Sequence, residues 1–175
     1  MGIKEITESA LAQLQHGSSR RDIFTSMSAA NPADTGKIAY CIASIPEDSL
    51  RTRYLRHNAL LCLLLIVYSV LSIISGLPIP QGEPTIFLVL TAGVPLVFCY
   101  FTFRFHGGIY RIMGLWFLVD IFETALLKGA PDGLSVLKLL TLFLIVTLSF
   151  LIGRKMFPNL RVLGPKKDES GHYQL

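Results

Sequence analysis

Length, composition and charge narrow the class of protein. The chain has 175 residues, of which 51% are hydrophobic and 16% charged, and its net charge is +4. A typical soluble domain carries about 25% charged residues. Here the apolar residues also concentrate after His57, so an ordinary soluble domain is excluded. The basic residues flank apolar stretches instead of forming one basic surface, which argues against nucleic-acid binding. Residues 1–20 lack the apolar core of a cleavable signal peptide.

Residues 1–57 predict a short helical cytoplasmic segment ahead of the apolar part. Apolar residues recur there at helical spacing, and Gly17 ends the first run. Ser19 followed by Asp22 is typical of a helix start. The acids after Pro46 suit the first turn of a further helix that continues into the first span. Two interpretations remain open: a docking module that binds a partner or the membrane surface, or a cap packed on the bundle.

Four apolar stretches follow, each close to the roughly 20 residues that a helix needs to cross a bilayer. Turns rich in Pro and Gly separate them, and such short connections make consecutive spans antiparallel neighbours. The third stretch is the weakest, because it contains Arg111, Asp120 and Glu123. We therefore predict an all-α fold, an integral membrane bundle of about four transmembrane helices. The expected spans are residues 58–76, 85–103, 109–127 and 134–153, followed by a basic cytoplasmic tail, residues 154–175.

The positions of Lys and Arg predict the orientation of this bundle. Cytoplasmic segments of membrane proteins carry an excess of these residues. Fourteen of the sixteen precede the first span, lie around the turn between the second and third spans, or belong to the tail. We therefore place both termini in the cytoplasm. A bundle of three spans would put the basic tail on the opposite side, so four spans fit the bias better.

Charged residues inside the predicted spans form the candidate site. Asp120 and Glu123 are three positions apart, on one face of the third span. Charges at membrane depth usually face the bundle interior and have a partner. Folding the chain about the turn near residue 130 places Glu123 opposite Lys138 and Asp120 opposite Thr141. We predict a Glu123–Lys138 ion pair and a hydrogen bond from Thr141 to Asp120. These groups either fix helix register or bind protons, ions or a charged partner.

No motif predicts catalysis. The sequence contains neither a G-x-x-x-x-G-K nor a G-x-G-x-x-G phosphate-binding loop. Its histidines and cysteines follow no metal-ligand or disulfide spacing, and no Ser, His and acid set shares a plausible surface. We therefore expect no enzyme activity, no cofactor and no metal site. The residues considered are His16, His57, His106, His172, Cys41, Cys62 and Cys99.

Short motifs in the tail mark a resemblance. After the last span come RKMFPN at 154–159, GPKK at 164–167 and GHY at 171–173, and IASIPE at 42–47 belongs to the same pattern. These stretches resemble small bacterial inner-membrane proteins with four spans, in which a basic K-x-F-P stretch follows the last span. The resemblance covers most of the chain. It implies a bacterial inner membrane, and it brings no activity with it because the group has none assigned.

Two functions from different classes fit these observations. The first is a non-enzymatic inner-membrane protein that binds a partner, as an accessory or regulatory subunit or as an immunity-type protein. The second is a small oligomeric transporter or channel in which Asp120 and Glu123 line a polar path. Both place the chain in a lipid bilayer, with a protein partner or further copies of itself and without nucleic acid.

Overall fold

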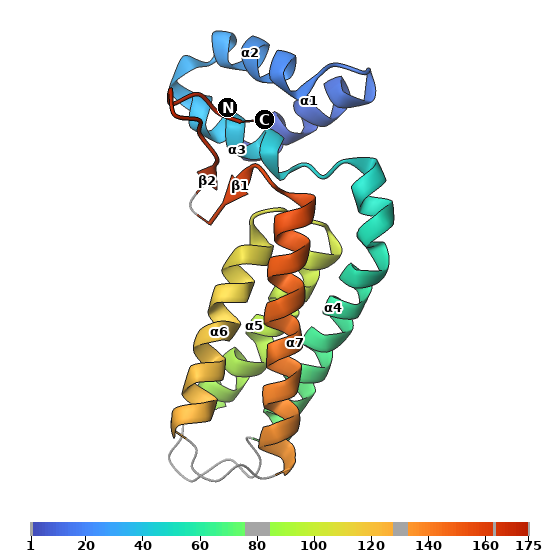
Figure 1. Ribbon diagram of the computed structural model, residues 1–175, viewed down its shortest axis with the longest axis vertical. Coiled ribbons are helices and arrows are strands. Elements are labelled where there is room, and N and C mark those ends of the chain that lie inside the picture. Colours follow the sequence, from blue (N-terminus) through green and yellow to red (C-terminus); the bar gives the residue numbers. More distant parts are fainter. Residues whose placement is uncertain (1, 76–84, 128–132, 163, 175) are drawn as a thin grey trace.

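The computed structural model describes residues 2–75, 85–127, 133–162 and 164–174 (Figure 1). The regular structure of these residues is almost entirely helical, which confirms the all-α class for the described part of the chain. Three short helices form a unit at one end, and four long helices form a bundle below it (Figure 1). In chain order the elements are α1 (Ile3–Gln15), α2 (Arg20–Ala30), the 3-10 helix η1 (Pro32–Asp34), α3 (Thr35–Ser44), α4 (Asp48–Ser75), α5 (Thr85–Phe103), α6 (Ile109–Leu127), α7 (Gly133–Met156), β1 (Leu160–Arg161) and β2 (Gly164–Pro165).

The N-terminal unit, α1 to α3, folds around a small core of its own. Helix α2 begins where the sequence predicts, and there the Asp22 backbone N–H donates to the Ser19 hydroxyl at 3.2 Å. That bond satisfies one of the N–H groups that a helix start leaves without a partner. The apolar faces of the three helices meet in one cluster, so the unit has a defined shape. The cluster consists of Ile6, Ala10, Ile23, Met27, Ile38, Cys41, Ile42 and Ile45.

Arg20 links the start of α2 to the end of α3. Its Nη1 donates to the Ile42 carbonyl at 3.0 Å and its Nη2 to the Ile45 carbonyl at 2.7 Å. The last carbonyls of a helix lack partners within the helix, and the planar guanidinium supplies two donors at once. Burial lowers the pKa of Arg20, against a smaller rise from the Glu47 charge. A guanidinium group does not lose its proton in proteins, so the side chain keeps its charge.

The four bundle helices share one core and turn apolar faces outward. Helix α4 packs against α5 and α7, and α6 packs against α7, whereas α5 and α6 touch each other less. Large apolar side chains are exposed on every helix, whereas soluble monomers rarely expose large continuous apolar patches. Helices α4 and α7 are long and apolar enough to cross a membrane. Examples of exposed residues are Leu63 and Ile66 on α4, Val97 on α5, Val119 on α6 and Phe143 on α7.

Two glycines allow α6 and α7 to approach closely. A Cβ atom on Gly114 of α6 would lie 3.0 Å from the ring of Phe150. One on Gly153 of α7 would lie 3.1 Å from the Cβ of Tyr110. Small residues at helix contacts let backbones come together and increase van der Waals packing, which is the main attraction between helices in a lipid environment.

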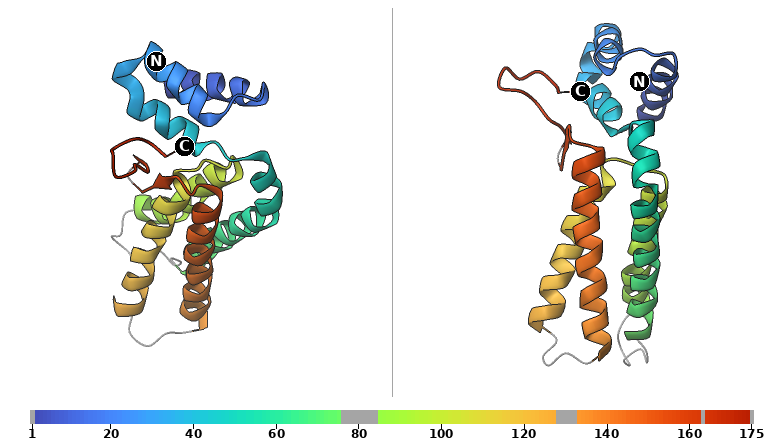
Figure 2. Two further views of the ribbon diagram at one scale, coloured as in Figure 1. Left: turned by 45° about the horizontal axis from the view of Figure 1, so that its top comes forward. Right: turned by 45° about the vertical axis from the view of Figure 1, so that its right-hand side comes forward.

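The C-terminal tail is folded and packs on the N-terminal unit. Strands β1 and β2 pair antiparallel, and Lys167 then pairs with Tyr173 in a further antiparallel bridge. The Gln174 N–H donates to the Lys166 carbonyl at 2.8 Å. Both strands contact α3, so the two ends of the chain lie together at one end of the molecule (Figure 2).

Gly107 and Gly108, in the turn between α5 and α6, form the junction between the N-terminal unit, the tail and the bundle. A Cβ on Gly107 would lie 2.7 Å from the ring of Phe157 and 2.9 Å from Leu160, both in the tail. A Cβ on Gly108 would overlap the hydroxyl of Tyr40, which belongs to α3. The three parts therefore meet at a point where the backbone carries no side chain.

Helix boundaries follow the predicted turns. Helices α5 and α6 occupy the ranges predicted for the second and third spans. Helix α4 begins at Asp48, upstream of the first span, as the acids after Pro46 indicate, and α7 continues past residue 153 to Met156. The predicted end of the first span at Gly76 and the turns at 77–84 and 128–132 lie outside the described residues.

Gly107→Ala should destabilise the junction. The new methyl group overlaps Phe157 and Leu160, and forcing extra volume into a packed site costs about 1–3 kcal/mol. Thermal unfolding of the purified protein should show a lower Tm. Gly93→Ala is the matched control, because nothing lies within 4 Å of its Cβ position in α5 and alanine favours a helix. Equal Tm values for the two variants would contradict the packing described.

Candidate functional site

A polar cluster lies inside the bundle, in the half away from the N-terminal unit. The hydroxyl of Tyr68 on α4 donates to Oδ2 of Asp120 on α6 at 2.5 Å. Tyr68 is fully buried, and its ring packs edge-on against Phe117. A buried tyrosine hydroxyl normally requires a hydrogen-bond partner, and a carboxylate is a strong acceptor. The contact therefore holds Asp120 at the α4–α6 interface.

Lys138 of α7 lies over the ring of the same tyrosine. Its side chain is buried, and its Nζ lies 5.2 Å from the centroid of the Tyr68 ring. A cation at this distance from an aromatic face is attracted by the negative charge above the ring, more strongly when water is excluded. Tyr68 thus contacts both a carboxyl group and an ammonium group, which come from different helices.

The other two residues of the predicted site, Thr141 and Glu123, have different surroundings. Thr141 is buried and its hydroxyl donates to the Leu137 carbonyl of its own helix at 2.9 Å, while Tyr68 supplies the donor to Asp120. Glu123 is exposed on α6. Counting residues from a turn gives the height of a position along a helix, but its rotation about the axis decides what it faces. The Glu123–Lys138 ion pair stays a prediction.

Ser72 extends the cluster along α4. It lies one turn beyond Tyr68 and is buried, and its hydroxyl has no hydrogen-bond partner among the described residues. A buried polar atom without a partner costs free energy, and a bound water or ligand that supplies the hydrogen bond removes that cost. The sequence argument did not place Ser72 or Tyr68 in the candidate site. A tyrosine within an apolar span was the available signal, because its hydroxyl must find an acceptor inside the bundle.

A second buried network lies at the opposite end of the bundle. The side-chain amide of Asn58 donates to the Thr102 carbonyl at 2.8 Å, and the Tyr110 hydroxyl donates to Asn58 Oδ1 at 2.7 Å. All three residues are buried, and Tyr110 stacks on Phe157 of the tail with centroids 5.7 Å apart. The network therefore ties α4, α5 and α6 together just below the junction. Each of these bonds satisfies a buried group, which indicates a structural role.

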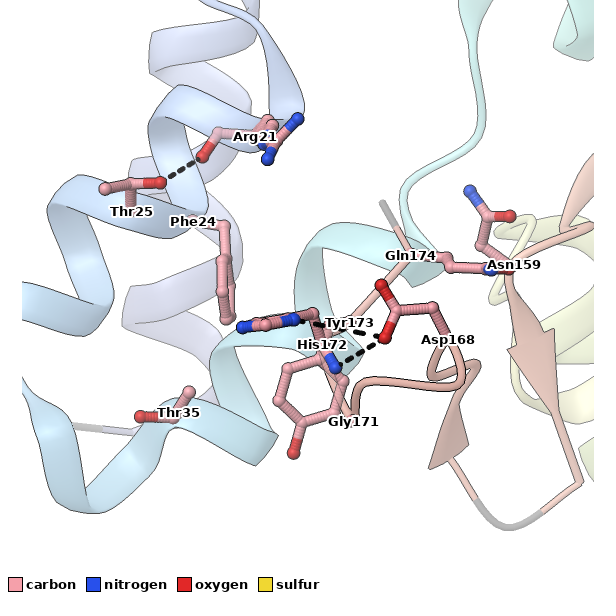
Figure 3. Close-up of a pocket in the computed structure, with 10 residues that line it drawn as sticks. All are labelled: Arg21, Phe24, Thr25, Thr35, Asn159, Asp168, Gly171, His172, Tyr173 and Gln174. Atoms are coloured by element: carbon pink, nitrogen blue, oxygen red, sulfur yellow. Dashed lines mark hydrogen bonds and ion pairs between the residues drawn. The ribbon is translucent and has the colours of Figure 1, made fainter.

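A groove of about 790 Å³ lies between the N-terminal unit and the tail (Figure 3). One wall comes from α2 and the start of α3, and the other from the folded tail. Phe24 contacts Tyr173 edge-on across the groove floor, with centroids 5.7 Å apart. The lining combines one aromatic contact with many polar side chains, namely Arg21, Thr25, Thr35, Asn159, Asp168, His172 and Gln174.

A tight turn fixes the tail wall of this groove. Oδ1 of Asp168 accepts from the Ser170 hydroxyl and from the His172 N–H, both at 2.8 Å. The Ser170 hydrogen bond is the main cause that lowers the pKa of Asp168, and the His172 N–H adds to it. The turn is therefore fully formed at neutral pH and loosens only as the pH falls through this lowered value.

Within the described ranges, no three His, Cys, Asp or Glu side chains are placed to hold a metal ion.

A double-mutant cycle measures the Tyr68–Asp120 contact. Tyr68→Phe should lower the free energy of unfolding by about 1–3 kcal/mol, because it removes the donor to a partly buried carboxyl group. Combined with Asp120→Leu, the loss should be smaller than the sum of the single losses by about 0.5–3 kcal/mol. Tyr100→Phe removes an exposed hydroxyl and should change little. Strictly additive losses would show that the two groups do not interact.

The comparisons with known proteins add no relative to this geometry. No protein-family model, curated protein or solved structure matches the chain. The case for a function therefore depends on the polar cluster in the bundle, the apolar outer faces of its helices and the groove that the N-terminal unit forms with the tail.

Proposed function

We propose that this chain is a non-enzymatic protein of the bacterial inner membrane that binds a protein partner on its cytoplasmic side. It acts as an accessory or regulatory subunit of a membrane assembly, or as an immunity-type protein. In this proposal all four bundle helices cross the bilayer. The exposed apolar residues on α5 and α6 support four spans, because these faces resemble those of α4 and α7 and need the same covering.

The distribution of basic residues supports a cytoplasmic position for both termini. Arginines gather at the end of the bundle that meets the N-terminal unit, on the first turns of α4, at the end of α5 and at the end of α7. Segments with excess Lys and Arg stay on the cytoplasmic side. The residues concerned are Arg51, Arg53, Arg56, Arg104, Arg111, Arg154 and Lys155.

The observation that carries the partner-binding proposal is the groove between the N-terminal unit and the tail. Its walls come from opposite ends of the sequence, and neither wall belongs to the bundle. Pockets of this size with an aromatic anchor and scattered hydrogen-bonding groups suit a peptide segment better than a small apolar ligand. Arg21 and His172 favour a segment with acidic side chains, although Asp168 lines the same groove.

Site-specific photo-crosslinking in living cells tests this proposal. A photoreactive phenylalanine at Thr25, which is exposed in the groove, should give one adduct of defined mass, because a bound segment lies within reach. The same residue at Gln15, exposed on α1 outside the groove, is the control and should not give that adduct. Tyr173→Ala should weaken the Thr25 adduct by removing the aromatic floor. Identical products from both positions, or none from Thr25, would contradict a partner in the groove.

A small oligomeric transporter or channel is the second candidate. The polar cluster favours it, because Tyr68, Asp120 and the unpartnered hydroxyl of Ser72 lie within a bundle with an apolar exterior. Intramembrane carboxyl groups are frequent elements of proton and ion paths. Four helices alone enclose a narrow route, so this function requires several copies, and Glu123 would then line a path between them.

Proton flux into liposomes separates the two candidates. If the bundle conducts protons, purified protein in liposomes loaded with a pH-sensitive dye should acidify the lumen under a proton gradient. Asp120→Asn should abolish that flux at unchanged Tm, since the amide keeps the hydrogen bond from Tyr68 but does not carry a proton. Val119→Leu, on the exposed face of α6, is the control and should leave any flux intact. If liposomes with the unmodified chain show no more flux than empty liposomes, the transporter candidate is excluded and only the partner-binding proposal remains.

A further inference from the structure

A second groove, distinct from the one in Figure 3, lies where the N-terminal unit meets the bundle. Its volume is about 440 Å³, and its lining comes from α1, α3, the start of α4 and the end of α5 with the following turn. The junction groove, as we name it, therefore sits at the level where the bundle ends and the N-terminal unit begins (Figure 1).

All charge that lines the junction groove is positive. Its basic side chains are Arg51, Arg104 and His106, and no carboxylate contributes to the lining. Both guanidinium groups lie over aromatic rings, Arg51 at 5.2 Å from the centroid of Phe105 and Arg104 at 5.1 Å from that of Tyr100. Stacking on a ring orients a guanidinium and leaves its N–H groups available to an anion.

The turn after α5, which carries Arg104 and His106 of this site, has a defined backbone conformation. The His106 N–H donates to the Phe101 carbonyl at 3.0 Å and the Phe105 N–H to the Thr102 carbonyl at 2.9 Å. This is the Schellman pattern, in which the residue at the left-handed position is usually glycine. Here it is Phe105, with φ of 54°. A left-handed conformation is strained for a residue with a Cβ, and burial of the Phe105 ring in the core offsets that strain.

Part of the remaining lining is apolar and open to the exterior. Ile3 and Leu11 of α1 line the groove, although they are 59% and 40% exposed, and Tyr100 of α5 is 54% exposed. These side chains continue onto the outward apolar face of α5. The groove thus combines a cationic pocket with an exposed apolar surface, at the end of a bundle that we propose spans the membrane. A phospholipid matches both features, because it carries a phosphate headgroup and acyl chains.

We propose that the junction groove binds an anionic phospholipid, with the headgroup phosphate between Arg51, Arg104 and His106 and an acyl chain along Tyr100 and α5. This rests on the proposed placement of the bundle in the inner membrane and is independent of the partner-binding groove. The lipid would seal the gap between the N-terminal unit and the bilayer surface. Basic pockets at the cytoplasmic ends of membrane helices are typical sites for such headgroups.

Lipid binding by the full chain in neutral detergent tests the proposal. Phosphatidylglycerol should raise the Tm and remain bound in native mass spectrometry, whereas phosphatidylcholine should do neither. The variant R51Q/R104Q should weaken phosphatidylglycerol binding at least tenfold. R53Q/R56Q is the matched control, because it removes the same charge from exposed α4 positions outside the groove and should bind like the unmodified protein. If R51Q/R104Q does not fold, R104Q alone replaces it, with an expected loss of about threefold.

Three results would overturn the proposal. Equal losses in the two double variants would show general attraction to positive charge. Stabilisation by inorganic phosphate alone, to the same extent as by the lipid, would show a soluble anion as the ligand. Absence of any difference between phosphatidylglycerol and phosphatidylcholine would exclude a headgroup site. Extraction of the chain from cell membranes by alkaline carbonate without detergent would instead contradict the membrane placement itself, so the two failures are distinguishable.

Discussion

The contact at Gly107 and Gly108 is the constraint on which the arrangement of the molecule depends. Tyr40 from the N-terminal unit and Phe157 from the tail both pack against these two residues, which have no side chains. A Cβ atom at either position would occupy the space that these two side chains fill. The contacts therefore depend on glycine, and they hold the N-terminal unit, the tail and the bundle together. The Tyr110 ring then stacks on Phe157 and connects the junction to the hydrogen bonds of Asn58. Junction, buried network and helix packing therefore form one continuous structure.

Much of the fold could be predicted because apolar residues and helix breakers determine it locally. Helices α5 and α6 begin and end at the predicted residues, since Pro- and Gly-rich turns stop helices by steric rules that act within a few positions. The Ser19 cap of α2 follows from the same kind of local signal. The folded tail was not predicted, because its short strands are stabilised by α3, which lies more than a hundred residues away in sequence.

The candidate site was predicted only in part, and the reason is geometric. Height along a pair of antiparallel helices follows from the sequence, which is why Asp120 and Lys138 could be named as candidates, although in different pairs. Both contact Tyr68, which comes from a third helix, α4. Which helices become diagonal or adjacent neighbours depends on packing of the whole bundle, including the close approach allowed by Gly114 and Gly153. Position counting contains no information about that choice.

The packing of the tail on α3 has a consequence for synthesis. A ribosome makes the N-terminal unit long before residues 159–174, so one wall of the groove in Figure 3 can form early and the other arrives only after α7 is complete. The groove can therefore be assembled only late in synthesis. A chain cut before these residues keeps its bundle helices but lacks one wall of the groove.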